Sequence, residues 1–559
     1  MNNEMKSLSL AVLLSFVAIY SVNYFFGIDQ NNALQNQISQ EQSSSDEVTI
    51  PQEPLVHMDE PKITQYSLTD DARLDFKNKA ISGTIRLKGS RFDNLYLQKY
   101  NETLDDQSTK IELLKPAEVN NHYFVDLGWL ALDPTIKLPT AQDVWHTESS
   151  MLTNEKPVIL VWNNSNGLKI NRKIILDDNY LFTVEDTIEN QSDSEIEVFP
   201  YALINKNISG IVAQRSVVHE GISSIIDGTL KEFKYAQIKK NSPKTFETEG
   251  GWLGFSDRYW FGSLILGEKE NAQVNFKNNG NDNYQIDYLG SRIIIPAHKF
   301  QKYTYKFFAG AKEIKLLDKY KKVNQFPKFD LAVDFGWYYF LTKPFFYILD
   351  FLYGFLGNMG WAILLFAALL RLFMFPIANK SFTNMAKMKA LQPKINDIRQ
   401  KYGDNQLLIQ QATMELYKRE KINPAAGCLP VFIQIPVFFS LYKVLNISIE
   451  IRHAPFIGWI KDLSAPDPLV LSKILHTNLI PGFIDIGLWP IFMGLTMVLQ
   501  QRLNPAPANK DQARMFALMP VFFTFMLGHF ASGLVIYWTL SNVLSIIQQK
   551  AIMHKNGVK

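Results

Sequence analysis

Four apolar runs in the last part of the chain constrain its fold more than any other feature. They cover residues 357–377, 427–447, 484–499 and 515–547. A helix of about 20 apolar residues spans the ~30 Å hydrocarbon layer of a membrane. The last run holds 33 residues, and a single helix of that length would measure about 50 Å. We therefore predict five spans here, the last two being short and joined by a tight turn at His529, Ser532 and Gly533.

Another apolar run, residues 8–28, follows Lys6 at the start of the chain. A cleaved signal peptide has a shorter apolar core and ends in small residues, whereas residues 22–27 are bulky and aromatic. We predict an uncleaved sixth span, a transmembrane anchor over residues 1–28, with a cleaved signal as the alternative. Asn, Gln and Ser are frequent in the stretch 29–54, which is typical of a flexible linker.

The charge of the chain is divided between two regions. Residues 336–559 hold 21 basic against 10 acidic residues, a net charge of +11, whereas residues 29–335 hold 35 against 43, a net charge of −8. The opposite signs indicate two environments rather than one surface that binds nucleic acid. The single cysteine, Cys428, excludes an intramolecular disulfide, and without a CxxC or Cys/His cluster we expect no metal site.

The basic residues of the C-terminal part gather in alternate connecting segments. Segment 379–426 has nine basic and four acidic residues and segment 500–514 has three and one, but segment 448–485 has three and four. Basic loops remain in the cytoplasm. Counting the spans then places both termini in the cytoplasm and the acidic middle region outside. The charges of the loops and the number of spans therefore give the same orientation.

The acidic middle, residues 55–330, predicts an all-β domain. It contains no apolar run long enough to span a membrane, and short stretches such as 81–87, 181–186 and 284–288 alternate between apolar and polar residues. Turn-forming residues separate these stretches, notably at 163–167, 177–179 and 278–282. Half-buried antiparallel strands with polar turns are typical of a large β-sandwich.

A search of this domain for chemistry finds few candidates. There is no G-x-S-x-G, H-E-x-x-H or G-x-G-x-x-G motif, so we expect no catalytic residue and no cofactor. Asp177 and Asp178 are either a carboxylate pair or part of a turn. Trp252 and the aromatic residues 259–261 either stack on a sugar or pack in the core.

Two segments flank the first C-terminal span. Residues 331–356 are dense in aromatic residues but contain Lys343 and Asp350, which favours an amphipathic helix in the membrane interface over a packed soluble helix. Helical spacing in segment 379–426, broken at Gly403 and Asp404, predicts an antiparallel helical hairpin. Its basic, Met-bearing face either contacts nascent chains, ribosomal RNA or a targeting receptor, or is simply solvated. The face comprises Met385, Lys387, Met388, Lys389 and Lys394.

Arg371 is the most informative single residue, because it lies inside a predicted span. A cation at such a depth costs about 2.5–3.5 kcal/mol on insertion scales and usually faces a bundle interior or a wet cavity. The alternative is that Arg371 extends to the cytoplasmic headgroups. The other polar residues of the spans form interhelical hydrogen bonds or line one hydrated groove with Arg371; they are Gln434, Thr496, Ser541 and Asn542.

Four motifs resemble those of the YidC/Oxa/Alb membrane protein insertase family. They are NPAAGCLPVFIQIPVFFSLY at 423–442, MAKMKALQPK at 385–394, SGLVIYWTLSN at 532–542, and FFAGAK at 307–312, the last typical of the Gram-negative branch. The resemblance runs essentially from end to end. It implies an inner-membrane protein with a five-span core over residues 357–559, an N-terminal anchor and a periplasmic β-supersandwich.

The resemblance also implies the residues of the groove. The family's groove arginine and glutamine correspond to Arg371 and Gln434, whereas an expected Thr or Ser is Ala367 here and an expected Tyr is Trp538, with Tyr537 retained. Apolar side chains of the third and fifth spans would guide an incoming helix sideways into lipid; we expect this of Phe438 and Phe522.

The implied function is insertion of nascent membrane proteins, without enzymatic chemistry. The implied partners are nascent membrane proteins, the Sec translocon and its accessory subunits, the ribosome or the signal-recognition-particle receptor at the hairpin and tail, and lipids. Two other classes remain open. A small-solute transporter would show solute uptake, and a membrane-tethered sugar enzyme would lose function on deletion of residues 60–320.

Overall fold

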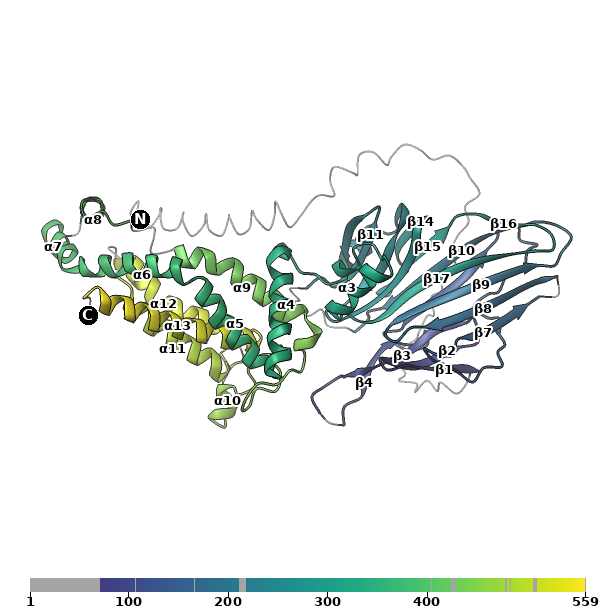
Figure 1. Cartoon of the computed structure of the whole chain (residues 1–559), viewed down its shortest axis with the longest axis horizontal. Coiled ribbons are helices and arrows are strands. Elements are labelled where there is room, and N and C mark those ends of the chain that lie inside the picture. Colours follow the sequence, from purple (N-terminus) through teal and green to yellow (C-terminus); the bar gives the residue numbers. More distant parts are fainter. Residues whose placement is uncertain are drawn as a thin grey trace. The chain divides into compact units, whose positions relative to one another are not determined.

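The computed structural model describes residues 71–557, except 106, 165, 211–217, 404, 424–428, 478–479, 483 and 506–509. The predicted anchor and linker, residues 55–70 and Cys428 lie outside the described residues. Along the described chain the strands come first, in purple to teal, and most of the helices follow, in green to yellow (Figure 1).

The described residues between Arg73 and Ala311 form seventeen strands. Their pairings are antiparallel, except that β1 pairs with β6 in parallel. A short helix, α2 (Tyr235–Lys240), interrupts the series. The strands are β1 (Arg73–Lys77), β2 (Ile81–Arg86), β3 (Arg91–Asn101), β4 (Lys110–Leu114), β5 (Tyr123–Leu130), β6 (Met151–Leu152), β7 (Val158–Asn163), β8 (Leu168–Leu176), β9 (Leu181–Asn190), β10 (Ile196–Asn207), β11 (Gly221–Ile226), β12 (Thr229–Lys234), β13 (Lys244–Ser256), β14 (Trp260–Asn278), β15 (Asn283–Gly290), β16 (Ile293–Ile295) and β17 (Lys299–Ala311).

Strands β8 and β9 illustrate how local sequence produces this β-rich region. Both alternate between buried and half-buried residues, as period-2 patterning requires. The turn between them is built by Asp177, whose Oδ1 accepts hydrogen bonds from the backbone N–H groups of Asn179 (2.8 Å) and Leu181 (3.0 Å). The interpretation of Asp177 and Asp178 as part of a turn is therefore confirmed.

Aromatic side chains fill the interior of the β-rich region. The rings of Phe182 and Phe307 stack with centroids 4.7 Å apart. Trp252 and Phe261 are fully buried and meet edge to face at 5.4 Å. Packing, rather than sugar stacking, is therefore the role of Trp252 and its aromatic neighbours.

One charged pair lies inside the same core. Arg172 on β8 and Asp186 on β9 face each other in register, and neither side chain is exposed to solvent. The Arg172 Nε and Nη2 atoms each donate to the Asp186 carboxylate at 2.8 Å, and Trp129 Nε1 donates to Asp186 Oδ2 at 2.8 Å. Pairing and hydrogen bonding together allow these charges to be buried.

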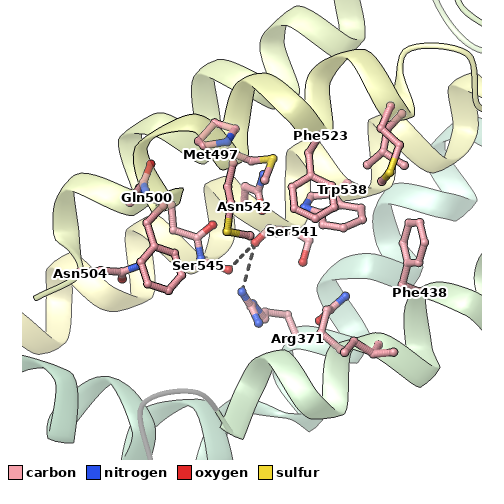
Figure 2. A pocket seen from close by; sticks show the side chains of 18 of the residues that line it. Arg371, Phe438, Met497, Gln500, Asn504, Phe523, Trp538, Ser541, Asn542 and Ser545 are labelled. Carbon is pink, nitrogen blue, oxygen red and sulfur yellow. Dashed lines mark hydrogen bonds between the residues drawn. The ribbon is translucent and has the colours of Figure 1, made fainter. Parts of the chain in front are cut away.

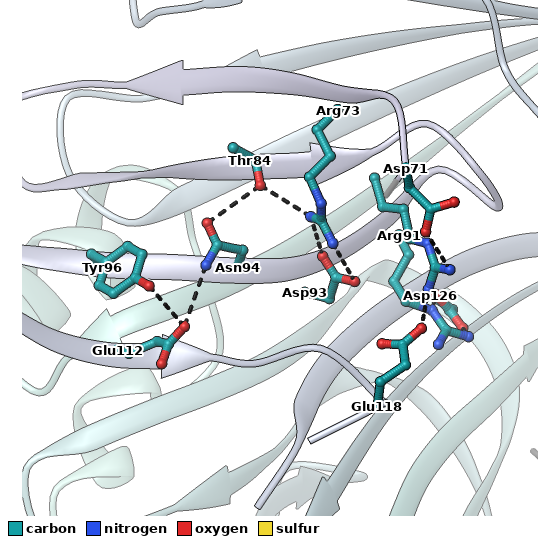
Figure 3. Close-up of polar contacts among 11 residues, drawn as sticks. Asp71, Arg73, Thr84, Arg91, Asp93, Asn94, Tyr96, Glu112, Glu118 and Asp126 are labelled. Carbon is teal, nitrogen blue, oxygen red and sulfur yellow. Dashed lines mark hydrogen bonds and ion pairs between the residues drawn. The ribbon is translucent and has the colours of Figure 1, made fainter. Parts of the chain in front are cut away.

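A second set of ion pairs crosses strands β1, β2, β3 and β5 (Figure 3). Arg73 Nη1 donates to Asp93 Oδ1 at 2.7 Å, and Arg91 Nη2 donates to Asp126 Oδ2 at 2.7 Å. The Asp93 side chain is fully buried. The network joins neighbouring strands through side chains as well as through the backbone ladder.

The helical part begins after β17. Its elements are α3 (Ile314–Val323), η2 (Phe329–Ala332), α4 (Tyr339–Leu356), α5 (Met359–Phe373), α6 (Phe375–Ala390), α7 (Gln392–Tyr402), α8 (Gln406–Arg419), α9 (Leu429–Ile447), η4 (Ile449–Ile451), α10 (Leu471–Ile474), α11 (Leu488–Leu503), α12 (Lys510–Leu527) and α13 (Ser532–Lys555). The stretch predicted to hold two helices joined by a turn is divided between α12 and α13, with the break at residues 528–531.

Within the described residues, no single helix meets both the length and the apolarity expected of a membrane span. Helices α5 and α6 meet these criteria only as a pair, and they are bent by 67° relative to each other. A single span is predicted over 357–377, but α5 ends at Phe373 and α6 begins at Phe375. The reason is Pro376, which occupies the first turn of α6, where its missing N–H is tolerated.

The segment predicted as a helical hairpin contains one more break than expected. Helix α6 ends at Ala390 and α7 begins at Gln392, with Pro393 in its first turn. Helices α7 and α8 then pack through a small apolar core, which comprises Leu391, Ile395, Leu416, Tyr417 and Ile422. The predicted break at Gly403 is present, with a φ of 58° that suits glycine.

An ion-pair network joins α3, η2 and α4. The Asp330 carboxylate accepts from Lys343 Nζ at 2.7 Å and from Tyr339 OH at 2.8 Å, and it pairs with Lys321 at 3.0 Å. Lys343 also contacts Asp318 at 2.7 Å. Lys343, which interrupts the aromatic segment in the sequence, is therefore neutralised by these two carboxylates.

We expect this network to make stability depend on pH in the acid range. Burial raises the pKa of Asp330, but its contacts with Lys343, Lys321 and Tyr339 outweigh burial and lower the pKa from 3.8 to about 2. A lowered carboxyl pKa stabilises the fold above the unfolded value, and this contribution, about 2 kcal/mol, is lost as the pH falls from about 4 to 2. Urea titrations of the full chain should therefore show Asp330→Asn less stable than wild type at pH 6, with the difference vanishing near pH 2. A difference that stays constant with pH would contradict the assignment.

Candidate functional site

A groove of about 550 Å³ lies among helices α5, α6, α9, α11, α12 and α13. Most of its wall is apolar, and one part carries amide and hydroxyl groups. The lining residues are Arg371, Phe382, Met385, Gln434, Ile435, Phe438, Phe439, Met497, Gln500, Gln501, Asn504, Phe516, Met519, Pro520, Phe523, Met526, Leu527, Trp538, Ser541, Asn542 and Ser545.

Arg371 is the only charged residue among the described residues that line the groove. Its Nη2 atom donates to the backbone carbonyl of Ser541 at 3.2 Å, across the groove (Figure 2). Its Nε atom is buried without a hydrogen-bond partner, and no carboxylate of the described chain forms an ion pair with it. The positive charge is therefore held in place but not neutralised.

Helix periodicity explains the position of Arg371. The buried face of α5 includes Ile363 and Ala367, which precede Arg371 by eight and four residues. Residues at this spacing share one helix face, so Arg371 continues the buried face at the end of the helix. The helix is fixed at its other end by Asn358, whose side chain caps it by accepting from the backbone N–H of Trp361.

Gln434 and Tyr537 lie together, as predicted, but in different roles. Gln434 on α9 lines the groove, and its Nε2 atom donates to Tyr537 OH on α13 at 2.8 Å. Tyr537 is 2% exposed and does not line the groove. It therefore supports Gln434 from behind, and the neighbouring Trp538 provides the surface at this level.

Asn542 and Thr496 form a second cross-helix pair. The Asn542 Nδ2 atom on α13 donates to Thr496 Oγ1 on α11 at 3.0 Å. Thr496 also donates to the Met493 carbonyl at 2.7 Å. Asn542 lines the groove but Thr496 does not, so Thr496 orients Asn542 rather than facing the cavity.

Three aromatic side chains form a wall along one part of the groove. Phe438 and Trp538 meet edge to face with centroids 4.7 Å apart, and Phe523 lies 6.1 Å from Trp538 (Figure 2). Phe522, predicted as the guiding residue of α12, is 62% exposed and lies outside the lining. Phe523 lines the groove in its place, because neighbouring helix residues differ by about 100° in direction.

The hairpin residues singled out from the sequence are mostly remote from the groove. Met385 lines it, whereas Met388 packs against the core of α7 and α8. Lys394 pairs with Glu420 at 3.0 Å on the surface, and Lys387 is exposed. Lys389 is half-buried and also lies outside the lining, so only Met385 of this set joins the candidate site.

Four further polar residues line the groove but were not predicted, namely Gln500, Gln501, Asn504 and Ser545. Ser545 follows Ser541 by one helical turn, so the spacing contained a signal for it. The three amide residues come just after the apolar run 484–499. Polar residues are common at such a position whether or not they face a cavity, so the sequence contains no signal for them.

Comparison with known proteins identifies the family. The family model described as "60Kd inner membrane protein" matches residues 351–558, and the one described as "YidC periplasmic domain" matches residues 73–348. The chain belongs to the YidC family of membrane protein insertases. The "Membrane protein insertase YidC" of Rickettsia bellii is 42% identical over 98% of this chain and 99% of its own length. The YidC of Brucella suis is 45% identical over 89% of this chain and 83% of its own length.

The YidC match confirms the family predicted from the motifs and the presence of a periplasmic β-rich domain, which the second family model covers. Among solved structures, an active YidC insertase with its first transmembrane domain resolved aligns with 84% of this chain and 90% of its own, at 18% identity and a TM-score of 0.37. A galactose mutarotase related enzyme from Lactobacillus acidophilus covers 43% of this chain and 97% of its own, at 8% identity and a TM-score of 0.31.

Proposed function

We propose that this chain inserts transmembrane segments of nascent proteins into the bacterial inner membrane, with the groove as a hydrated, positively charged passage. The observation that carries the proposal is Arg371, whose guanidinium lies in a largely apolar groove with a backbone carbonyl as its only described partner. A cation in such a place is costly unless water or an anion reaches it. Family membership supports the same function.

The groove would act by shortening the distance that a polar tail must cross through hydrocarbon without water. A nascent segment must carry its hydrophilic end across hydrocarbon before its helix can settle in the membrane. Helices α5 and α11 have 15 and 16 residues, which correspond to about 22–24 Å, against ~30 Å of hydrocarbon. Short helices also favour local thinning of the bilayer, so both effects lower the barrier.

Two parts of the groove would take different parts of a substrate. Arg371 attracts acidic side chains of the arriving tail, and the aromatic wall of Phe438, Phe523 and Trp538 guides the apolar segment towards lipid. Phe522, exposed beside this wall, would then contact the segment after it leaves the groove. Hydrophobic partitioning and the membrane potential drive the transfer.

The same proposal includes orientation and partners. The chain would span the inner membrane six times with both termini in the cytoplasm and the β-rich domain in the periplasm, and α4 would lie in the membrane interface. One face of α4 is buried and the other exposes Phe340, Phe351 and Phe355, as an interfacial helix requires. The basic hairpin and tail would meet the ribosome or the signal-recognition-particle receptor, and the chain would act alone or with the Sec translocon.

Site-specific crosslinking to a stalled nascent chain tests the proposal. A photoreactive residue at Gln434 or Phe523 is expected to crosslink to the substrate, in liposomes that contain the reconstituted full chain and support insertion. The same probe at Phe522 should crosslink later, to longer nascent chains whose apolar segment has left the groove. Leu518, exposed on α12 and outside the lining, is the matched control. Insertion by the liposomes without any crosslink from Gln434 or Phe523 would exclude this groove as the route.

A further inference from the structure

Neutral polar side chains also line the groove, and of those labelled in Figure 2 only Asn542 lies beside the aromatic wall. Helix α11 contributes Gln500 and Gln501 and is capped by Asn504, and helix α13 contributes Asn542 and Ser545. We call these five residues the polar row. Figure 2 shows Gln500, Asn504, Asn542 and Ser545 across the groove from Arg371.

The polar row follows two helices that run in the same direction. Asn542 contacts Thr496 at 3.0 Å, and seven residues further along α13 the Gln549 Nε2 atom donates to Asn504 Oδ1 at 3.2 Å. Eight residues separate the two contacts on α11 and its cap, which corresponds to about 12 Å. An extended peptide covers that length with about four residues.

The hydrogen-bonding groups of the polar row are only partly used by the protein. The NH₂ group of Asn542 donates to Thr496, and its Oδ1 atom has no partner among the described residues. Asn504 accepts from Gln549, and its Nδ2 atom likewise has no described partner.

The remaining amides of the polar row are freer still. The side chains of Gln500 and Gln501 form no hydrogen bond within the described chain. Gln549 is 1% exposed, so it fixes Asn504 from behind. Gln500 and Gln501 are half-buried and Asn504 is exposed, so the row presents free donors and free acceptors to the groove.

We propose that the polar row is a binding site for an extended, uncharged polar segment of the substrate, held mainly through its backbone. The inference rests on the insertase function proposed above and adds a second substrate class to the same groove. Every residue of an extended segment carries a backbone N–H and C=O, and neutral amides can bond both without a charge being desolvated. Arg371 adds a second contact for tails that carry carboxylates, so tails without them, such as those rich in Ser, Thr, Asn and Gln, depend most on the polar row.

The test uses two substrates that differ only in the translocated tail, one with Ser and Asn and one with Asp at the same positions. The full-length chain with Gln500→Leu, Gln501→Leu and Asn504→Leu is expected to insert the neutral-tail substrate about tenfold more slowly, as loss of one or two hydrogen bonds implies. The acidic-tail substrate should change less than twofold. Leu499→Ala, an exposed residue on the same helix outside the lining, is the control and should change neither rate.

A second measurement removes the ambiguity of a misfolded variant. A photoreactive residue at Gln501 of the otherwise unchanged chain should crosslink to the neutral tail, and one at Leu499 should not. Absence of a crosslink from Gln501 would contradict binding at the polar row. So would an equal decrease in the insertion rates of both substrates, in a triple variant that unfolds at the wild-type temperature. Failure of the unchanged chain to insert either substrate would instead overturn the insertase function.

Discussion

Replacing Arg371 with Ala is expected to slow insertion of substrates with acidic tails by roughly 10- to 100-fold, because hydrogen bonds to charged groups contribute about 1.5–3 kcal/mol. The groove would then contain no charged lining residue within the described chain, so a carboxylate entering it would lose its water without gaining a partner. Substrates whose tails carry no acidic residue should be inserted at nearly the wild-type rate. The measurement is the initial rate of protease protection of a translocated tail in proteoliposomes.

Two variants separate the local effect of Arg371 from net charge. Lys380→Ala removes one positive charge from an exposed position on α6 outside the groove, and its insertion rates should match wild type. Arg371→Lys keeps a cation but cannot present the planar guanidinium, so its rate on acidic tails should lie between those of wild type and Arg371→Ala. Normal insertion of acidic tails by Arg371→Ala would show that the guanidinium does not attract them.

Asp186→Asn is expected to destabilise the β-rich domain by about 3–5 kcal/mol, because it leaves the buried Arg172 charge without its partner. Arg172 cannot reach water from its position, since its side chain is fully buried. The measurement is hydrogen exchange of peptides from β8 and β9 in the full chain at increasing urea concentration. Removing both charges, with Arg172→Met and Asp186→Leu, should destabilise the β-rich domain by less than Asp186→Asn alone.

The neighbouring register position offers a matched control. Lys173 pairs with Glu185 at 3.6 Å on the same two strands, and both side chains are more than 40% exposed. Exposed pairs contribute at most about 1 kcal/mol, so Glu185→Gln should leave exchange in β8 and β9 nearly unchanged. Equal effects of the two substitutions would mean that burial does not determine the energy of these pairs.

Local patterns were sufficient to predict much of the β-rich region but not the pairing of strands that are distant in the sequence. The alternation at 181–186 and the turn at Asp177 predict adjacent strands, and β8 and β9 are such a hairpin. The pairing of β9 with β17, where Tyr305 lies opposite Val184, joins residues over one hundred positions apart. No local pattern encodes that register, because it depends on which distant strands share a core.

The site was predictable where the polarity of a residue differs sharply from that of its neighbours in the sequence. Arg371 is a cation in an apolar run, and it lies at the groove. The sequence does not distinguish Phe522 from Phe523, because both are apolar in an apolar helix. Only the packed neighbours determine which one faces inward. Likewise, Tyr537 and Thr496 were expected to line the groove, but their hydrogen bonds place them behind it.

The partner of Arg371 on α13 is a main-chain carbonyl, that of Ser541. Every amino acid supplies a backbone carbonyl at that position, so a substitution at residue 541 keeps the acceptor of the hydrogen bond from Arg371. Helical geometry, rather than side-chain identity, then fixes where the charge resides. Substitutions at residue 541 should therefore change the chemistry of this wall while the cation stays at one depth.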